Sequence, residues 1–264
     1  MLERVTAVEY VRPMSSGRTA PLLLACERGN GSTIYVVAKF SASCDEKEVS
    51  LAREVIAACL AADLRLPVPE PVLIEIPSSW SDVISDGAHR ARVRNSNQIA
   101  FGSVLVTGGF AAWTPDTHVQ EASVDTALGI FAFDAIIQNV DRRSENPNCL
   151  VRGEHIRIID HELAFAARLI LGWNPPWRVG GLSWLEQAGK HIFRKDLRRR
   201  GVDLRPVGLV WSAISDLRLA DYRDAIPAEW RPMVDADVDT ALTLIRDARD
   251  NIAGCLDEIK RVLS

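Results

Sequence analysis

The chain has 264 residues, of which 47% are hydrophobic and 25% are charged, and its formal net charge is −4. This is the composition of an ordinary globular protein, and its charge gives no reason to expect a nucleic-acid or anionic-membrane partner. The five cysteines form no CxxC pair, no signal peptide opens the chain, and no apolar run reaches the roughly 20 residues of a membrane helix, so we expect a cytoplasmic protein.

The first hundred or so residues are predicted to consist mostly of strands. Runs of β-branched and apolar residues predict these strands at residues 5–11, 22–27, 33–40, 72–76 and 98–107. A glycine-containing turn at residues 28–32 joins the second and third strands as a hairpin. Apolar residues on one face predict a helix from about residue 45 to residue 63. Segment 78–97 is polar and is expected to be an irregular, mobile insertion.

Gly108 and Gly109 mark a change from strands to helices. Periodic apolar residues predict the helices at residues 124–138, 182–189, 206–217 and 236–263. A short hairpin, with strands at residues 149–152 and 155–159, interrupts them. Together these patterns predict an α+β protein with two lobes, a strand-rich N-lobe at residues 1–109 and a mainly helical C-lobe at residues 110–264.

The most informative cluster of polar residues consists of Asp141, Asn146 and Asp160. Asn146 follows Asp141 by five residues, and Asp160 comes directly after the predicted hairpin. Kinase-like phosphoryl transfer needs one carboxylate that orients the attacking hydroxyl, and an amide oxygen and a second carboxylate that hold Mg²⁺ against the nucleotide phosphates. The loop and the hairpin are expected to bring these three side chains together, so the spacing indicates this chemistry.

Lys39 and Glu54 are the candidates for the nucleotide-binding part of such a site. Lys39 ends an apolar strand, where a kinase-like site requires a cation for the α- and β-phosphates. The alternative is an outward lysine on an edge strand, but the Asp141 cluster favours the first interpretation. Glu54 lies near the middle of the following helix and is expected to pair with Lys39, although it could also be a surface glutamate.

The connection between the first two strands, residues 14–21, carries one glycine and three hydroxyl groups. Gly17 and the hydroxyls of Ser15, Ser16 and Thr19 are expected to contact phosphates, with a plain hairpin as the equal alternative. The chain contains neither a G-x-x-x-x-G-K-[ST] loop nor a G-x-G-x-x-G motif. Arg142 is expected to brace the Asp141 loop through a carboxylate.

Several other polar residues are interpreted as structural. His161 and Glu162 follow Asp160 and would suit a metal hydrolase, but no HExxH or zinc spacing exists. The other four histidines are interpreted as solvated or core-edge side chains: His89, His118, His155 and His191. The basic run at residues 198–200 is interpreted as a solvated helix end, where cations suit the helix dipole.

The order of Lys39, Glu54, the loop Asn139-x-Asp141-Arg-x-x-x-Asn146 and Asp160 resembles the HipA-like kinases, which are atypical members of the protein-kinase-like fold. A more distant similarity is to the type II phosphatidylinositol 4-kinases, which also use an Asp-Arg-x-x-x-Asn loop. The resemblance covers most of the chain and is strongest to compact members that lack the extra N-terminal subdomain of the toxin kinases.

This resemblance implies a role for each matching residue. Asp141 would be the catalytic base, Asn146 and Asp160 would hold Mg²⁺, and Lys39 would bind the α- and β-phosphates of ATP. The implied activity is an ATP- and Mg²⁺-dependent serine/threonine kinase that acts on a protein. The chain departs from common kinases because Asp160-His161-Glu162 replaces Asp-Phe-Gly and no Ala-Pro-Glu segment follows.

The motif does not specify the substrate, because the same base and metal ligands serve any hydroxyl. A small-molecule or lipid kinase of the same fold is therefore an alternative, and so is a non-catalytic nucleotide-binding module in a complex. The presence of the base, both metal ligands and the lysine favours a catalyst. The expected partners are ATP, an unidentified protein substrate and, by the resemblance, a small partner protein.

Overall fold

The computed structural model describes residues 2–15, 17–166 and 172–264. The chain divides into two compact units. Unit 1 comprises Met1–Ile56, Pro69–Thr107 and Asp221–Val238, and unit 2 comprises Ala57–Val68, Gly108–Ala220 and Asp239–Ser264. No helix in the described part of the chain combines the length and the apolar character that crossing a bilayer requires.

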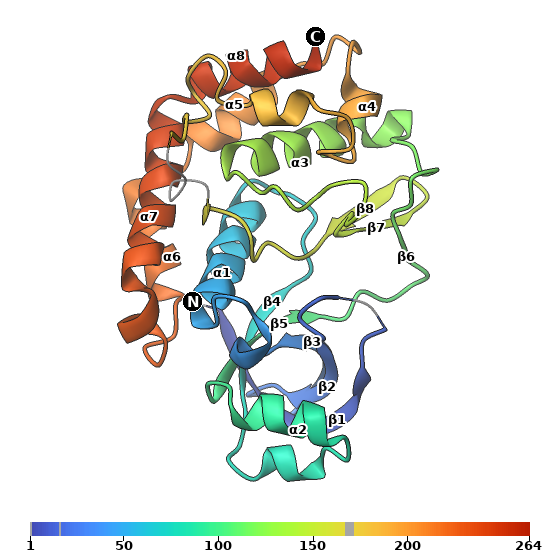
Figure 1. Cartoon of the computed structure of the whole chain (residues 1–264), viewed down its shortest axis with the longest axis vertical. Helices are drawn as coiled ribbons and strands as arrows, with labels where there is room; N and C mark the ends of the chain where they lie inside the picture. Colours follow the sequence, from blue (N-terminus) through green and yellow to red (C-terminus); the bar gives the residue numbers. More distant parts are fainter. Residues whose placement is uncertain (1, 16, 167–171) are drawn as a thin grey trace. The chain divides into compact units, whose positions relative to one another are not determined.

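Within the described residues of unit 1, five strands close into a barrel in the order β1-β2-β3-β5-β4. Their bounds are β1 Glu3–Pro13, β2 Leu22–Glu27, β3 Thr33–Lys39, β4 Pro71–Glu75 and β5 Ile99–Val104. The β1–β4 pair is parallel and closes the ring, and the other pairs are antiparallel. Figure 1 shows this ring in blue and green. The strands agree with the predicted ones to within a few residues at each end.

The interior of the barrel is filled by alternating apolar side chains. Leu22, Leu24, Val36 and Ile74 are at most 2% exposed. Gly102 on β5 is needed there, because a Cβ atom at this position would lie 2.4 Å from Cγ1 of Val36. The barrel is therefore packed with side chains and is not a ligand cavity.

Segment 78–97 corrects the expectation of an irregular insertion. It forms a 3-10 helix, η2 (Trp80–Val83), and an α-helix, α2 (Gly87–Arg94). Trp80 and Val93 belong to the apolar core of the barrel, so a polar segment contributes a few large side chains to that core. Those few apolar residues were too widely spaced in the sequence to indicate an ordered element.

The helix α1 (Glu48–Asp63) follows β3, and its residues Leu51, Val55 and Leu60 are fully buried. Burial is wider than the single apolar face that the sequence predicted, because all residues from 50 to 58 are buried. The α-helix begins three residues after the predicted start, because residues 45–47 form a turn. Glu54 lies in the first half of α1, which belongs to unit 1.

Unit 2 contains the apolar helix α3 (Val124–Ile136) and, in its described part, a three-stranded sheet in the order β6-β7-β8. Strand β6 covers Ala111–Ala112, and β7 (Cys149–Arg152) and β8 (His155–Ile158) form the predicted hairpin. The pairing of Cys149 with Ile158 closes this hairpin and brings the end of β8 back beside the start of β7.

The helices that follow are shorter than predicted. Residues 182–189 contain only the four-residue 3-10 helix η5 (Ser183–Glu186), after which comes the short helix α4 (Arg194–Leu197). The predicted helix 206–217 corresponds to α5 (Arg205–Ser212), which ends early, and a separate helix, α6 (Asp216–Asp224), follows it. The predicted helix 236–263 is divided into α7 (Arg231–Asp250) and α8 (Ile252–Leu263). Asn251 separates α7 from α8, and asparagine favours such a boundary because its side chain competes for backbone hydrogen bonds.

Candidate active site

The predicted pair of Lys39 and Glu54 is present in unit 1. Lys39 is the last residue of β3, and its Nζ lies 2.5 Å from Oε1 of Glu54 on α1. Both side chains are withdrawn from water, with 11% of Lys39 and 3% of Glu54 exposed. A buried carboxylate of this kind fixes the direction of the ammonium group and stabilises its charge. The interpretation of Lys39 as an outward edge-strand lysine is therefore wrong.

The loop between β1 and β2 is a compact hairpin connection. The Met14 amide donates to the Pro21 carbonyl at 2.9 Å, and the Ala20 amide donates to the Gly17 carbonyl at 3.0 Å. Gly17 has a φ of +112°, a conformation that only glycine adopts readily. Among the predicted phosphate contacts, Ser15 and Gly17 are exposed, and Ser16 lies outside the described residues. Thr19 is only 3% exposed, which turns its hydroxyl away from water.

The carboxylate of Asp141, in unit 2, is held by two asparagines. Nδ2 of Asn146 donates to Oδ2 of Asp141 at 2.7 Å, and Nδ2 of Asn148 donates to the same oxygen at 3.0 Å. The loop between Asp141 and Asn146 is stabilised by two backbone hydrogen bonds. The Arg143 amide donates to the Asn146 carbonyl at 3.2 Å, and the Asn146 amide donates to the Arg143 carbonyl at 3.0 Å. Five residues of loop therefore turn Asn146 back onto Asp141, as the spacing predicted.

Asn148 also connects the Asp141 loop to the hairpin of β7 and β8. The Ile159 amide donates to the carbonyl of Asn148 at 3.0 Å, while the Asn148 side chain binds Asp141. Asp160 follows immediately and has a φ of +61°, in the left-handed region that non-glycine residues rarely occupy. Unusual backbone conformations of this kind concentrate at functional sites, where the surrounding structure enforces them. The chain thus carries Asp160 to the loop that holds Asp141.

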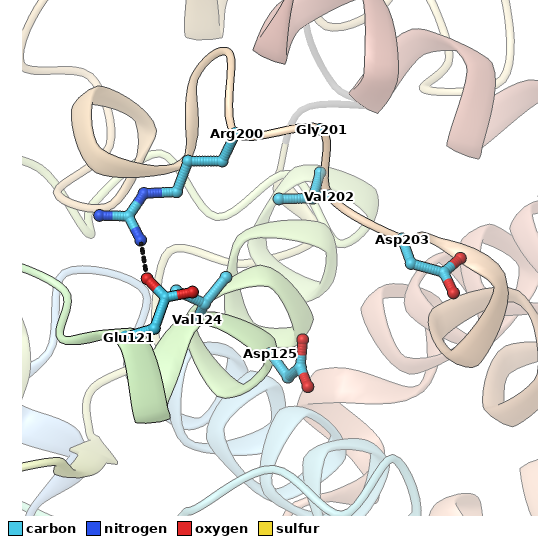
Figure 2. A pocket seen from close by; sticks show the side chains of 7 residues that line it. All are labelled: Glu121, Val124, Asp125, Arg200, Gly201, Val202 and Asp203. Carbon is cyan, nitrogen blue, oxygen red and sulfur yellow. Dashed lines mark hydrogen bonds and ion pairs between the residues drawn. The ribbon is translucent and has the colours of Figure 1, made fainter.

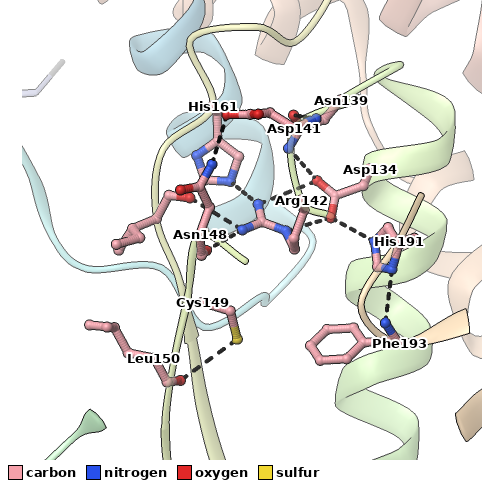
Figure 3. A network of polar contacts seen from close by, with 11 residues as sticks. Asp134, Asn139, Asp141, Arg142, Asn148, Cys149, Leu150, His161, His191 and Phe193 are labelled. Atoms are coloured by element: carbon pink, nitrogen blue, oxygen red, sulfur yellow. Dashed lines mark hydrogen bonds and ion pairs between the residues drawn. The ribbon is translucent and has the colours of Figure 1, made fainter. Parts of the chain in front are cut away.

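Arg142 braces both segments from inside the protein (Figure 3). Its Nε donates to Oδ2 of Asp134 at 2.6 Å, and both of these side chains are fully buried. Its Nη1 donates to the carbonyls of Asn148 and Ile159, the latter at 3.2 Å. Its Nη2 donates to Nε2 of His161 at 3.0 Å. One guanidinium therefore fixes the Asp141 loop and the end of the hairpin together, which confirms the predicted bracing through a carboxylate.

Asp134 is the electrostatic centre of this network. Burial by itself would raise the pKa of its carboxyl group, but the charge of Arg142 and the hydrogen bond from His191 outweigh burial and hold the pKa well below its usual value. Nδ2 of Asn139 adds a third donor at 2.7 Å. The ionised carboxylate therefore accepts hydrogen bonds from Arg142, His191 and Asn139, as a buried charge requires.

His191 is the second support of Asp134. The Phe193 amide donates to its Nδ1 at 3.2 Å, so the proton lies on Nε2, which is 3.1 Å from Oδ2 of Asp134. Burial lowers the pKa of His191, although Asp134 opposes this, and the ring is neutral at neutral pH. The interpretation of His191 as a solvated or core-edge side chain is therefore wrong.

Sequence reasoning missed Asp134 and Asn148, and it missed the role of His191. Asp134 could have been found, because it is a lone acid within the apolar run Phe131-Ala132-Phe133-Asp134-Ala135 and such an acid needs a buried partner. Asn148 gave no such signal, since an Asn-Pro-Asn sequence is also typical of an ordinary turn.

A pocket in unit 2, shown in Figure 2, contains none of the predicted site residues. It has a volume of about 490 Å³ and lies at the start of α3, where Arg200 pairs with Glu121 at 3.0 Å. Among the described residues, no three His, Cys, Asp or Glu side chains gather in a cluster that could hold a metal ion.

A model of the HipA-like kinase family matches residues 7–258 of this chain. The chain belongs to the HipA-like kinase family. Its fold agrees, because the crystal structure of the Helicobacter pylori proinflammatory kinase CtkA matches this HipA-like kinase with a TM-score of 0.52 and 12% identity. That match covers 99% of this chain and 96% of CtkA. Family and fold together identify a protein-kinase-like phosphotransferase of the predicted α+β class.

Two further solved structures match with lower TM-scores. The MAP kinase LmaMPK10 from Leishmania major matches with a TM-score of 0.29 and 11% identity, over 97% of this chain and 84% of that one. The open conformation of CtTel1 matches with a TM-score of 0.33 and 10% identity, over 94% of this chain and 12% of that one. No curated protein matches the sequence.

Proposed function

We propose that this HipA-like kinase transfers the γ-phosphoryl group of ATP to a serine or threonine hydroxyl of a protein, with Mg²⁺ as cofactor. The observation that carries the proposal is the Asp141 carboxylate, which Asn146 and Asn148 hold at 2.7 and 3.0 Å while Arg142 fixes the loop from behind. A carboxylate held in this way is oriented to accept a proton from an attacking hydroxyl.

The remaining predicted residues receive roles that fit their surroundings. Residues 1–109 would act as the nucleotide-binding lobe, in which Glu54 directs the ammonium of Lys39 toward the α- and β-phosphates. Ser15, Ser16, Gly17 and Thr19 would lie near the phosphates, and the exposure of Ser15 and Gly17 favours these two over the buried Thr19. Residues 110–264 would form the catalytic lobe.

Mg²⁺ fits the donor set of Asn146 and Asp160. Both residues offer oxygen atoms, and the amide nitrogen of Asn146 faces Asp141, so that its oxygen is the atom left for a cation. Mg²⁺ commonly takes one or two carboxylates and completes its shell with water and substrate phosphates. When bound, the ion would neutralise charge on the phosphates.

The test is incubation with γ-labelled ATP and Mg²⁺, first of the protein alone and then with a cell lysate. Mass spectrometry should find phosphate on serine or threonine residues of the protein or of lysate proteins. Label that appears only in lipids or small metabolites would contradict the protein acceptor, and transfer that is unchanged by a metal chelator would contradict the role of Mg²⁺.

A further inference from the structure

A second pocket in unit 2, with a volume of about 460 Å³, lies directly beside the loop that carries Asp141. Its wall includes Ser144 of that loop and Gly189 of the segment before α4. The Ser144 amide donates to the Gly189 carbonyl at 2.9 Å, and the Ile192 amide donates to the Arg142 carbonyl at 3.2 Å. The pocket is thus fixed to the catalytic loop by two backbone hydrogen bonds.

Gly189 makes this close approach feasible. Its φ is +79°, and a Cβ atom at this position would lie 3.3 Å from Oγ of Ser144. A larger residue would therefore have to move the pocket wall away from the loop. Ser144 lies three positions after Asp141, and three residues of chain span at most about 11 Å. A substrate group bound beside Ser144 would therefore lie within a few residues, along the substrate chain, of a substrate hydroxyl that faces Asp141.

The pocket combines an aromatic floor with a positively charged rim. Trp113 is 5% exposed and packs edge-to-face on Phe193, with ring centroids 5.1 Å apart. Lys195 and Arg198 are exposed on the rim. Arg194 also lines the pocket, and burial, followed by the charge of Arg198, lowers the pKa of Arg194. Positive charges are therefore crowded at this rim.

The acid of the pocket does not neutralise this rim. Asp196 is the one carboxylate among the described lining residues, and its Oδ2 accepts the Val119 amide at 2.7 Å while Oδ1 lies 3.3 Å from Nδ1 of His118. Both oxygens of the Asp196 carboxylate thus face Val119 and His118. The rim therefore presents net positive charge in a chain whose net charge is −4.

We propose that this pocket recognises an acidic segment of the protein substrate, with a carboxylate or phosphate two to four residues from the accepted serine or threonine. The proposal rests on the proposed protein-kinase function and names its substrate class. Lys195 and Arg198 would contact the anionic group, and Trp113 would pack against the adjoining side chain. A protein segment is favoured over a nucleic acid because the acceptor of the proposed kinase is a protein, and the chain's net charge of −4 provides no general attraction for nucleic acid.

The test measures binding separately from catalysis. The probe is a fluorescein-labelled peptide with one serine and three glutamates at two to four residues from it, and its glutamine counterpart is the reference. Fluorescence anisotropy should show tighter binding of the glutamate peptide. The double variant K195E/R198E should weaken its binding on the order of tenfold, as expected for two reversed rim charges. K195A is the milder second variant and should give a smaller loss in the same direction.

Arg199→Glu is the matched control, because Arg199 belongs to the same basic run but does not line the pocket. It should bind the glutamate peptide like the wild type, and melting curves should show that every variant is folded. Kinase assays with the same peptides should give a lower KM for the glutamate peptide with little change in kcat.

The outcomes separate the two proposals. Binding that depends on Lys195 and Arg198, without phosphorylation of any peptide or protein, would overturn the proposed kinase activity and leave the acidic-segment site standing. Equal binding of the two peptides, no binding of either, or equal weakening by Arg199→Glu would overturn the site. Displacement of the peptide by single-stranded RNA or by anionic lipid vesicles at lower concentration would overturn the assignment to a protein segment.

Discussion

Replacing Asp134 with alanine is expected to destabilise the protein by about 3–5 kcal/mol, the range for breaking a buried ion pair. The structure sets this magnitude because both Asp134 and Arg142 are fully buried, with Nε of Arg142 2.6 Å from the carboxylate. The substitution leaves the guanidinium without its counter-charge. It also removes the acceptor of Asn139 and His191, whose donors lie 2.7 and 3.1 Å away.

Thermal unfolding followed by tryptophan fluorescence measures this effect. At roughly 2–4 °C per kcal/mol for a chain of this size, the midpoint should fall on the order of 10 °C. Asp203→Ala is the matched control, because Asp203 also pairs with an arginine, at 2.7 Å, but its side chain is 49% exposed. Its midpoint should fall by only a few degrees, because the exposed pair contributes little and the Arg205 amide that Asp203 also accepts is worth about 1 kcal/mol. Asp134→Asn, which keeps the side-chain volume and one acceptor oxygen, should lie between the two.

The reasoning about the buried network would be refuted if Asp134→Ala and Asp203→Ala melted at the same temperature. A large loss of stability in both variants would also contradict it, because the exposed pair is screened by water and contributes little. Hydrogen exchange adds a local measurement. Amides of residues 141–148 and 158–162 should lose protection in Asp134→Ala, since Arg142 holds both segments through carbonyls.

Three further outcomes are expected. Burial lowers the pKa of His191 in the folded protein. Below about pH 6.5 the unfolded chain therefore binds a proton at this residue that the folded chain does not bind, so the free energy of unfolding should fall as the pH drops. His191→Gln should flatten this fall by at most about 1.4 kcal/mol per pH unit, and an unchanged slope in melting curves would refute a buried neutral ring. Lys39→Ala should weaken ATP binding in calorimetry roughly 10- to 100-fold, the loss of one charged hydrogen bond, and wild-type affinity would exclude a phosphate contact. Mg²⁺-ATP at about a hundred times its dissociation constant should stabilise the wild type by roughly 2.7 kcal/mol, and Asp160→Ala should lose the Mg²⁺-dependent part of that gain in a thermal-shift assay.

Much of the local structure could be predicted because it follows from short-range patterns. The strands of unit 1 and the hairpin before Asp160 are marked by apolar runs and by glycine turns. The Lys39–Glu54 pair was predicted because the Asp141 cluster favoured a phosphate-facing lysine, and a glutamate on the following helix can hold such a lysine in place. The return of Asn146 onto Asp141 follows from five residues of irregular loop.

The remaining features depend on contacts between distant residues. Asp134 and His191 are 57 positions apart, and nothing in the sequence around His191 indicates that it is buried against a carboxylate. Segment 78–97 is polar on average, so that its few apolar residues, which complete the barrel core, gave no periodic signal. The C-terminal helices were predicted too long because apolar periodicity continues across short breaks such as Asn251.

The most direct measurement of the central claim compares phosphotransfer by the wild type and by Asp141→Asn under single-turnover conditions with γ-labelled ATP. The amide keeps the shape of the side chain but does not take up the proton of the acceptor hydroxyl. The transfer rate is therefore expected to fall about 10²- to 10⁴-fold while the dissociation constant of Mg²⁺-ATP stays within a few-fold of the wild type. Transfer at the wild-type rate by Asp141→Asn would contradict the assignment of Asp141 as the catalytic base.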